Sequence, residues 1–384
     1  MYNREFELNS DHKSSFFLFG PRGTGKTSWV KAKFPDALYI DLLDTGLYTD
    51  LLSAPSKLEN LIQASKARWV IIDEVQRIPA LLNEVHRLIE SKGICFILTG
   101  SSARALRKKG VNLLAGRALI YHMHPLTSRE LGDDFDLAHS LRYGNLPSVY
   151  TLPKPQHYLN TYINAYIRQE VLEEGLTRRL DAFSRMLEAA SFSQGSVINC
   201  NEIAREVGIG RKTIENYFQI IEDLLIGVRI PVFKRRAKRD MTTHPKFYFF
   251  DAGVYRALRP QGVLGSDQEL DGAGMETLFF QELRACIDYH RFDYSIYYWR
   301  TRAKQEVDFV LYGKSGFFAF EIKRSERLSP KDLKGLQLFE KDYPEAKLFI
   351  IYGGKWREQH GNITAIPITE ALKALPTILG QYAD

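Results

Sequence analysis

The stretch GPRGTGKT, Gly20 to Thr27, decides the fold expected for the first part of this 384-residue chain. It matches the phosphate-binding loop pattern G-x-x-x-x-G-K-[ST]. The apolar run FFLFG leads into it, and the run TSWVKAKF, which has helical spacing, continues from it. Because a strand, a glycine-rich loop and a helix in this order are the context that the pattern requires, the sequence predicts a nucleotide site on a parallel sheet.

The residue types in this loop suit a nucleotide phosphate. Gly23 and Gly25 let backbone N–H groups turn toward phosphate oxygens, and the positive end of the helix dipole points at the same anion. Lys26 is expected to reach the β- and γ-phosphates of ATP, and the Thr27 hydroxyl to ligate Mg²⁺. The residues expected to bind the nucleotide are Gly20, Pro21, Arg22, Gly23, Thr24, Gly25, Lys26, Thr27, Ser28, Asp73 and Ser101.

Residues up to about 135 alternate short apolar runs with amphipathic stretches. Such alternation, with continuously apolar strands, predicts a parallel sheet that is covered by helices on both faces. The expected strands are Phe16–Gly20, Ala37–Leu42, Trp69–Asp73, Cys95–Gly100 and Ala118–His124.

The third of these strands ends in two acidic residues. WVIIDE places Asp73 and Glu74 directly at the end of an apolar run. Asp73 is expected to hold Mg²⁺ through water, and Glu74 to polarise the attacking water, which favours ATP hydrolysis over binding alone. The alternative is an acidic pair that caps a helix after the strand.

Two further motifs belong to the same hypothesis. CFILTGSS ends a buried strand in Thr99, Ser101 and Ser102, any of which can sense the γ-phosphate or cap the next helix. LLAGR ends in Arg117. In an oligomeric ATPase such an arginine can act on the γ-phosphate of a neighbouring subunit, and otherwise it forms an ordinary surface ion pair.

In this order, GPRGTGKT, WVIIDE, LTGSS and LAGR resemble the motifs of the AAA-like branch of P-loop ATPases. More closely, the chain resembles a prokaryotic family that couples such an ATPase to a C-terminal domain of the restriction-endonuclease-like, PD-(D/E)xK, fold. The resemblance covers nearly the whole chain. It implies ATP binding and hydrolysis in the N-terminal domain, and it constrains fold more than function elsewhere.

The middle of the chain changes its pattern twice. Residues 136–195 carry long amphipathic helical runs, and residues 196–264 carry a helix–turn–helix pattern followed by short strands, which resembles a winged helix. The basic run KRRAKR, Lys234 to Arg239, would lie in the wing, and the alternative is a solvated loop. Acidic residues on the second helix leave open a role as an ATPase lid or protein dock. The polar residues that begin this helix, where such domains contact DNA, are Arg211, Lys212, Thr213 and Asn216.

Charged residues interrupt the apolar strands of EVDFVLYGKSGFFAFEIK, Glu306 to Lys323. Alternate residues of a strand share a face, so Glu321 and Lys323 are expected to point the same way. With Glu276 on the preceding helix and Asp308 on the neighbouring strand, this set resembles the PD-(D/E)xK nuclease signature. The resemblance implies Mg²⁺ or Mn²⁺ held by Glu276, Asp308 and Glu321, with Lys323 orienting or deprotonating the attacking water.

Other interpretations of these residues stay open. Glu321 and Lys323 can form an exposed ion pair, and the domain can keep the fold yet bind DNA or assemble without cutting. The leading hypothesis is an ATP-hydrolysing, DNA-associated protein with a metal-dependent, nuclease-like domain. The alternative is a regulatory ATPase switch that binds DNA or a protein partner without cleavage, and a third possibility is a chaperone-like ATPase that acts on protein.

Composition agrees with these hypotheses. The 52 Lys and Arg residues against 46 Asp and Glu give a net charge of +6, a mild lean toward acidic partners such as DNA. Three widely separated cysteines fit a reducing, cytoplasmic compartment, no apolar run approaches the ~20 residues of a membrane span, and a homo-oligomer is compatible with Arg117. The expected α/β multidomain fold has a P-loop ATPase at 1–135, a helical linker or lid at 136–195, a winged helix at 196–264 and a restriction-endonuclease-like domain at 265–384.

Overall fold

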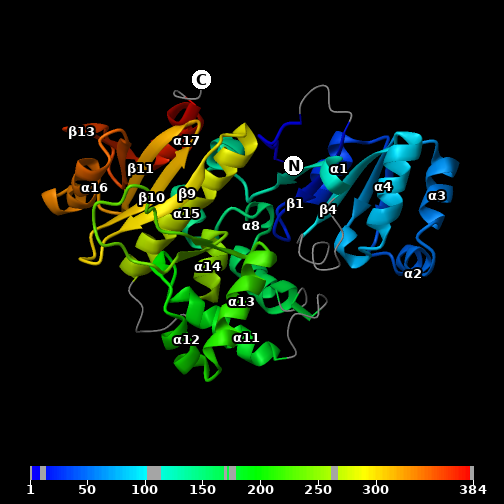
Figure 1. Cartoon of the computed structure of the whole chain (residues 1–384), viewed down its shortest axis with the longest axis horizontal. Helices are drawn as coiled ribbons and strands as arrows, with labels where there is room; N and C mark the ends of the chain where they lie inside the picture. Colours follow the sequence, from blue (N-terminus) through cyan, green and yellow to red (C-terminus); the bar gives the residue numbers. More distant parts are fainter. Residues whose placement is uncertain are drawn as a thin grey trace. The chain divides into compact units, whose positions relative to one another are not determined.

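The computed structural model divides into two compact units, which are described separately (Figure 1). The N-terminal unit comprises Phe6–His124 with the short segment Asp223–Ile226, and the C-terminal unit comprises Met1–Glu5, Pro125–Glu222 and Gly227–Asp384. The residues that the structure describes are 2–8, 14–101, 114–167, 171–172, 179–260 and 267–380. Within these residues no helix has the length and apolar character needed to cross a membrane.

A five-stranded parallel sheet forms the centre of the N-terminal unit. Its order is β2-β3-β4-β1-β5, and every neighbouring pair is parallel. The strands predicted from the apolar runs are therefore confirmed. Their bounds are β1 Ser15–Phe19, β2 Leu38–Asp41, β3 Trp69–Asp73, β4 Cys95–Gly100 and β5 Ala118–His122.

Apolar side chains are buried on both faces of this sheet, because alternate residues of β1 point to opposite sides. Phe17 and Phe19 lie in a core with residues of α3 and α4. Phe16 packs on the other side against the rings of Phe34 and Trp69, at centroid distances of 6.2 and 6.3 Å. The helices of this unit are α1 Lys26–Lys33, α2 Thr45–Ser53, α3 Lys57–Ser65 and α4 Leu81–Lys92, with short 3₁₀ turns at η1 Val75–Arg77 and η2 Leu114–Gly116.

The strand order determines which loops meet. β4 lies between β1 and β3, and the three strands run in the same direction. Their carboxyl ends therefore share one edge of the sheet, which is where ligands bind in open α/β sheets. The loop after β1, Asp73 at the end of β3 and Thr99 near the end of β4 are brought to this edge.

Helices and a small sheet make up the first part of the C-terminal unit. α12 and α13 are joined by a short turn in which Gly208 has a φ of 73°, a left-handed conformation that favours glycine. Strand β8 pairs antiparallel with both β6 and β7. The winged-helix assignment stays a prediction. The bounds are α6 Ser128–Leu131, η3 Gly132–Asp134, α7 Leu137–Tyr143, α8 Pro147–Thr151, α9 Pro155–Thr161, the π-helical η4 Tyr162–Ile167, α11 Leu180–Ser191, β6 Ser196–Val197, α12 Cys200–Val207, α13 Arg211–Asp223, β7 Gly227–Ile230, β8 Lys246–Phe249 and α14 Ala252–Leu258.

A six-stranded mixed sheet forms the second part of the same unit. Its order is β13-β14-β12-β11-β10-β9, with β9, β10 and β11 antiparallel and β11, β12 and β14 parallel. The apolar and amphipathic runs from Met275 to Ile351 predict a helix, three strands, a helix and a strand in this order. This order is present, and β13, β14 and α17 extend it. The bounds are α15 Asp267–His290, β9 Ser295–Arg300, β10 Glu306–Gly313, β11 Gly316–Lys323, α16 Pro330–Asp342, β12 Lys347–Tyr352, β13 Glu358–His360, β14 Ile363–Pro367 and α17 Ile368–Gly380.

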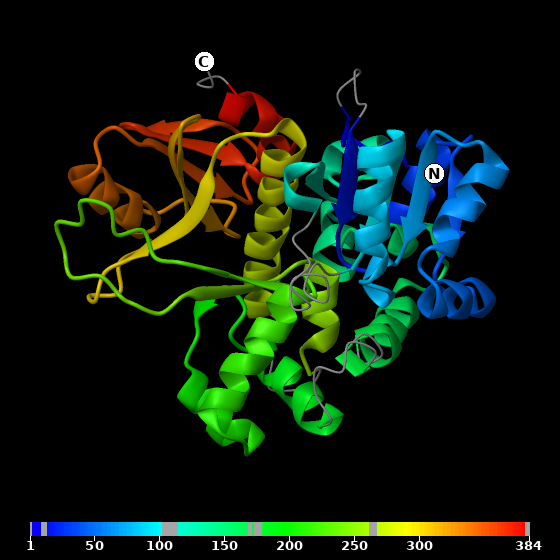
Figure 2. The ribbon, with the colours of Figure 1, turned by 45° about the vertical axis from the view of Figure 1, so that its right-hand side comes forward.

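The long helix α15, yellow in Figure 2, runs beside this sheet. Its residues Phe279 and Leu283 share a core with Phe309 and Phe320 of the sheet. Leu336 of α16 lies in a separate core with other sheet residues. Helices therefore bury both faces of the six-stranded sheet, which explains its strongly apolar strands.

The sequence predicts a glycine-rich joint at Gly262, Gly265, Gly272 and Gly274, ahead of a helix from Met275, and the structure corrects this prediction in part. Gly272 and Gly274 lie inside α15, whereas Gly262 and Gly265 fall outside the described residues. A glycine within a helix costs about 1 kcal/mol relative to alanine. Packing of α15 against the sheet and against α7 outweighs this local preference, which the sequence pattern could not weigh.

The connection between β7 and β8 lies against the edge strand β9. The N–H of Phe233 donates to the carbonyl of Tyr298 at 2.7 Å, and the N–H of Thr242 donates to the carbonyl of Arg300 at 3.1 Å. The basic run Lys234 to Arg239 lies in this connection and is exposed. The small sheet and the six-stranded sheet thus belong to one compact unit, and the expected boundary at 264 stays a prediction.

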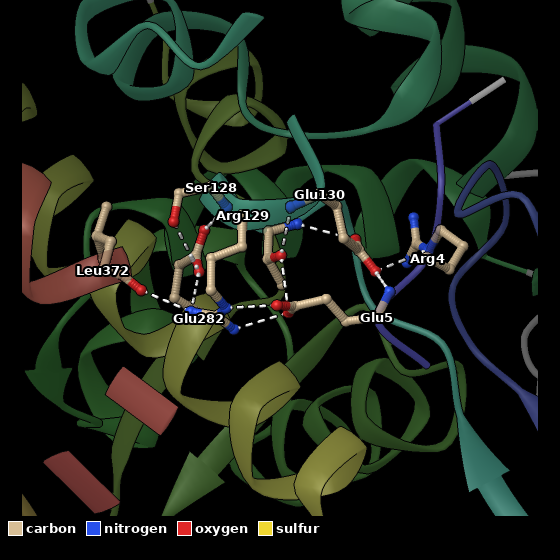
Figure 3. A network of polar contacts seen from close by, with 8 residues as sticks. Arg4, Glu5, Ser128, Arg129, Glu130, Glu282 and Leu372 are labelled. Carbon is tan, nitrogen blue, oxygen red and sulfur yellow. Dashed lines mark hydrogen bonds and ion pairs between the residues drawn. The ribbon is translucent and has the colours of Figure 1, made fainter. Parts of the chain in front are cut away.

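A buried polar network joins the first residues of the chain to the C-terminal unit (Figure 3). Arg129 donates to the two carboxylate oxygens of Glu5 at 2.5 and 2.8 Å, and to the Leu372 carbonyl at 2.6 Å. Glu282 of α15 accepts a hydrogen bond from the backbone N–H of Ser128. Burial raises the pKa of Glu282 to about 8, so this carboxyl group is a titratable part of the core.

Candidate nucleotide site and carboxylate cluster

Backbone conformation shapes the loop between β1 and α1. Gly23 and Gly25 have φ angles of 81° and 92°, in the left-handed region that other residues rarely adopt. A Cβ atom at Gly20 would lie 2.3 Å from the Met123 carbonyl oxygen, so this position also requires glycine. Helix α1 begins at Lys26, and the first N–H groups of a helix lack partners within it. The loop therefore offers a concentration of N–H donors to an anion.

Lys26 turns back over this loop. Its ammonium donates to the carbonyl oxygens of Gly20 at 2.8 Å and Pro21 at 3.1 Å, and the residue is buried. The buried Thr24 hydroxyl also donates to the Pro21 carbonyl, at 2.9 Å. These contacts hold a positive charge at the mouth of the glycine loop, where the motif predicts phosphate oxygens.

Asp73 collects three hydroxyl groups at the edge of the sheet. Its Oδ2 accepts hydrogen bonds from Thr27 at 2.8 Å and from Tyr39 at 2.6 Å, and its Oδ1 accepts one from Thr99. Asp73 is only 4% exposed. Burial and the hydrogen bond to Asp73 raise the pKa of the Tyr39 hydroxyl, so Tyr39 stays a neutral donor. Thr27 and Asp73 thus lie together as an oxygen-rich pair, as the sequence predicts.

Glu74 follows Asp73 in an unusual backbone conformation. Its φ of 58° and ψ of 46° place it in the left-handed region, which costs a non-glycine residue of order 1–3 kcal/mol. The Gln76 side-chain N–H₂ donates to the Glu74 carboxylate at 2.5 Å and to the Ser101 hydroxyl at 3.2 Å. A Cβ atom at Gly100 would lie 2.4 Å from the Gln76 Oε1 atom, so glycine here makes room for this amide.

The other residues predicted for the site make no described contact with Asp73. Arg22 is half-buried in the glycine loop and Ser28 is exposed on α1. Arg117 forms an ion pair with Glu90 of α4, and both side chains are largely exposed. This contact is the surface ion pair considered as its alternative. Ser102 lies outside the described residues.

The sequence patterns missed Tyr39 and Gln76. Tyr39 lies within a strand whose aromatic and aliphatic residues gave no reason to single out one hydroxyl. Gln76 is three residues beyond Asp73, in the 3₁₀ turn that follows β3. Its position after the acidic pair is the only signal in the sequence that could have suggested a role.

Comparison with known proteins supports the interpretation of this edge. Residues 12–132 match the family model of an AAA domain. Together with the parallel sheet and the glycine loop, this match supports a P-loop, AAA-like ATPase domain that binds ATP. Residues 134–267 match a domain of unknown function (DUF8612), and residues 271–371 match another domain of unknown function (DUF4143).

Relatives of this chain match most of its length. An uncharacterized protein of Mycobacterium tuberculosis is 26% identical over 377 residues, which span 94% of this chain and 79% of the relative. An uncharacterized protein of Methanocaldococcus jannaschii is 23% identical over 82% of this chain and 75% of its own length.

Two solved structures are also similar to it at low scores. The replication initiator DnaA bound to AMPPCP and single-stranded DNA has a TM-score of 0.29 at 15% identity, over 55% of this chain and 83% of that chain. Protein VC1899 from Vibrio cholerae has a TM-score of 0.24 at 12% identity, over 96% and 98% of the two chains.

A second concentration of charge lies in the C-terminal unit, around Lys246 of β8. Its ammonium lies 2.7 Å from Glu276 of α15, 2.7 Å from Glu306 of β10 and 2.9 Å from Asp308 of β10. Lys246 is 1% exposed. The Tyr248 hydroxyl donates to Glu276 from the same strand as Lys246. The structure thus brings Glu276 and Asp308 together, with a lysine between them that the sequence analysis did not single out.

Local backbone geometry places Asp308 in this cluster. The register of β10 against β9 shifts between Val307 and Val310, and such a bulge redirects a side chain. The second Asp308 oxygen accepts a hydrogen bond from the Ile322 N–H of β11 at 2.9 Å. Although burial opposes it, the nearby Lys246 ammonium lowers the pKa of Asp308. Asp308 is therefore an ionised partner of Lys246.

Glu321 and Lys323 form their own pair on β11, on the same side of the strand as predicted. The Lys323 ammonium donates to Glu321 Oε1 at 2.6 Å. The other oxygen, Oε2, is buried and has no hydrogen-bond partner among the described residues. Burial and the charge of Asp308 raise the pKa of Glu321 to about 8. The same two causes raise the pKa of Glu276 to about 7.

A metal ion does not fit this donor set as it is arranged. Within the described ranges, no group of three or more His, Cys, Asp or Glu side chains has a geometry that could hold a metal. Glu276 and Asp308 share the Lys246 ammonium, and Glu321 faces Lys323. Lys246 lies in the run HPKFYFF, which gives no sequence signal of these contacts. Its partners Glu276 and Asp308 are 30 and 62 residues farther along the chain.

A cleft of about 1160 Å³ opens beside this cluster within the C-terminal unit. Its lining is rich in basic residues, namely Arg211, Arg229, Arg300, Arg302 and Lys304. Arg211 pairs with Glu215 at 2.8 Å, and Arg300 with Glu306 at 3.3 Å, so part of this positive charge is neutralised. Of the residues predicted to contact DNA, Arg211 faces the cleft, whereas Lys212 and Asn216 are exposed and Thr213 is half-buried.

Proposed function

We propose that the chain is an ATPase that hydrolyses ATP at the edge of the N-terminal sheet. The observation that carries this proposal is the contact of Thr27 with Asp73, which joins the end of the glycine loop to the end of β3. Beside it lie a buried Lys26 and a glycine loop whose left-handed Gly23 and Gly25 suit the binding of an anion. The match of residues 12–132 to an AAA domain supports the same conclusion.

Binding of ATP follows from the chemistry of the loop. The N–H groups around Gly23 and Gly25 are suited to the β-phosphate, and the Lys26 ammonium can exchange the Gly20 and Pro21 carbonyls for phosphate oxygens. A hydroxyl and a carboxylate 2.8 Å apart, Thr27 and Asp73, are the hard oxygen donors that Mg²⁺ prefers. Bound Mg²⁺ would neutralise charge on the β- and γ-phosphates.

Hydrolysis requires a group that orients and polarises water, and Glu74 is the residue proposed for it. Its left-handed backbone turns the carboxylate away from the strand direction, toward Gln76 and Ser101. Gln76 and Ser101 are proposed to hold Glu74 and the water in place. Thr99 and Tyr39 are positioning residues, since both act through Asp73.

An arginine finger at Arg117 is proposed only for an oligomer. In the isolated chain Arg117 is engaged with Glu90. An exposed ion pair of this kind contributes about 0–1 kcal/mol, so a neighbouring subunit can displace it at small cost.

For the C-terminal unit, the arrangement of Lys246 favours binding without cleavage over a metal-dependent nuclease. The positions of Glu276 and Asp308 relative to a lysine support a regulatory ATPase whose C-terminal unit contacts a partner. The candidate partners are a protein and DNA. The cleft lined by Arg302 and Lys304, together with the exposed basic run Lys234 to Arg239, favours DNA binding.

The experiment that tests the proposed function is Mg²⁺-dependent ATP turnover by the full chain and by Lys26→Ala. Turnover that depends on Lys26 supports the site, and turnover that persists in the variant places hydrolysis elsewhere. DNA cleavage, measured beside Asp308→Ala, distinguishes the two functions of the C-terminal unit.

A further inference from the structure

Lys246 is a charged residue in the middle strand of a small sheet. Its backbone pairs with Val197 on one side and Ile230 on the other, so β8 is fixed between two neighbours. A buried ammonium costs several kcal/mol unless it is paired. The sequence places it among aromatic residues, in KFYFF, where a valine or isoleucine would suit a buried strand. This lysine therefore needs a specific explanation.

Three carboxylates supply the partners. An ammonium has three N–H donors, and Glu276, Glu306 and Asp308 each place an oxygen within 2.9 Å of it. Glu276 comes from α15, and Glu306 and Asp308 come from β10, so all three are distant from Lys246 in the sequence. Their charge raises the pKa of Lys246, against the effect of burial, so the ammonium stays charged. The geometry is that of a cation enclosed by its ligands.

The same position is the one that a divalent ion would need. Mg²⁺ binds oxygen ligands at about 2.0–2.1 Å in near-octahedral geometry, so an ion between Glu276 and Asp308 would overlap the Lys246 ammonium. Strand pairing on both edges of β8 fixes the backbone of Lys246, and the three carboxylates hold its ammonium at this position. Glu321 Oε2, which has no hydrogen-bond partner among the described residues, is the further oxygen available near Asp308.

We propose that Lys246 is the resident cation of this carboxylate cluster and excludes divalent metal ions from it. The C-terminal unit would then carry a latent metal site, with Glu276, Asp308 and Glu321 as ligands that a metal reaches only when the lysine is removed. This inference does not depend on ATP hydrolysis, because all of these residues lie in the C-terminal unit.

The test measures Mn²⁺ binding by the full chain without nucleotide. Binding is detected as a loss of the electron paramagnetic resonance signal of aqueous Mn²⁺. The variants are Lys246→Met, which keeps the length of the side chain without its charge, and Lys246→Met with Asp308→Asn. Asp308→Asn in the wild-type background serves as the matched control. Any Mn²⁺ that this variant still binds is held elsewhere, for example at Asp73 in the N-terminal unit. The expected result is one additional Mn²⁺ per chain in Lys246→Met, lost again in the double variant, and no effect of Asp308→Asn on Mn²⁺ binding by the wild type.

Two results would overturn the proposal. The first is a wild-type Mn²⁺ site that Asp308→Asn removes, since metal and lysine would then coexist. The second is a folded Lys246→Met chain that gains no site. Because Lys246→Met leaves three buried or half-buried carboxylates without their cation, its folding is also measured with Mn²⁺ and with a chelator. Recovery of folded protein by Mn²⁺, but not in the double variant, supports the proposal; failure to fold under both conditions contradicts it.

Discussion

The Thr27 hydroxyl donates a 2.8 Å hydrogen bond to the carboxylate of Asp73, 46 residues farther along the chain. This contact joins the helix after β1 to the end of β3, two strands that are separated in the sheet by β4. It brings a hydroxyl and a carboxylate, both suited to Mg²⁺, to one point beside the glycine loop. The contact is the structural centre of the proposed ATPase site.

Thr27 is expected to set the requirement for Mg²⁺. Thr27→Ala removes the hydroxyl, so the Mg²⁺ concentration at half-maximal ATP turnover should rise roughly tenfold or more, whereas Thr27→Ser should stay close to wild type. The measurement is ATP turnover over a Mg²⁺ titration. Equal Mg²⁺ dependence in all three proteins would show that Thr27 has no such role.

Glu74 is expected to act in hydrolysis and not in binding. Glu74→Gln keeps the size of the side chain and its contact with Gln76 but removes the base, so single-turnover hydrolysis should fall roughly 10²–10⁴-fold. Affinity for a fluorescent ATP analogue should stay within about threefold, because Glu74 is expected to stabilise the transition state and not the bound nucleotide.

Glu84→Gln on α4 is the matched control for this variant. Glu84 pairs with Arg87 and makes no described contact with the glycine loop or Asp73. It should leave both measurements unchanged. A Glu74→Gln chain that hydrolyses ATP at the wild-type rate would show that the catalytic base is another residue.

Glu282 is expected to make stability depend on pH. Burial raises its pKa in the folded chain to about 8, from an ordinary value of 4.5. A raised carboxyl pKa means that the folded state holds the proton more tightly, so its contribution to stability is complete below about pH 4.5 and is lost as the pH rises toward 8.

The comparison uses Glu282→Gln, which cannot ionise. Between pH 5 and pH 8 the wild type should lose roughly 2–4 kcal/mol relative to this variant, because each unit of pKa shift is worth about 1.4 kcal/mol. The measurement is the thermal unfolding midpoint of both proteins across this range. Parallel pH profiles would mean that Arg129 and the Ser128 N–H keep Glu282 ionised in the folded chain.

The cleft is expected to contact nucleic acid through exposed positive charge. Arg302→Glu with Lys304→Glu should weaken binding of a fluorescent DNA oligonucleotide roughly tenfold at low salt, and the salt dependence of binding should also decrease. The control is Lys355→Glu, an exposed lysine that does not line the cleft. Equal affinity of the wild type and the double variant in fluorescence anisotropy would contradict DNA binding here.

Much of the N-terminal fold could be predicted from the sequence. The glycine loop follows a strongly apolar run, and the strands between helices are continuously apolar, so period and motif point to the same sheet. The meeting of Thr27, Asp73 and Thr99 also follows from the parallel arrangement of β1, β3 and β4. These features are local in sequence or are imposed by the direction of the strands.

The contacts that were missed depend on tertiary packing. Lys246 meets Glu276, Glu306 and Asp308 only because the β7–β8 connection lies against β9, and no local pattern encodes that contact. The bulge in β10 moves Asp308 away from simple alternation. The prediction of a joint at Gly272 and Gly274 is wrong because glycine disfavours helices only locally, and burial of α15 outweighs that preference.

The most direct measurement is Mg²⁺-dependent ATP turnover by the full chain, Lys26→Ala and Lys33→Ala. Lys26 is buried at the glycine loop and Lys33 is exposed near the end of the same helix. Turnover should fall at least about 100-fold in Lys26→Ala, through loss of charge at the phosphates, and stay unchanged in Lys33→Ala. Equal turnover in Lys26→Ala and wild type would contradict ATP hydrolysis at this site.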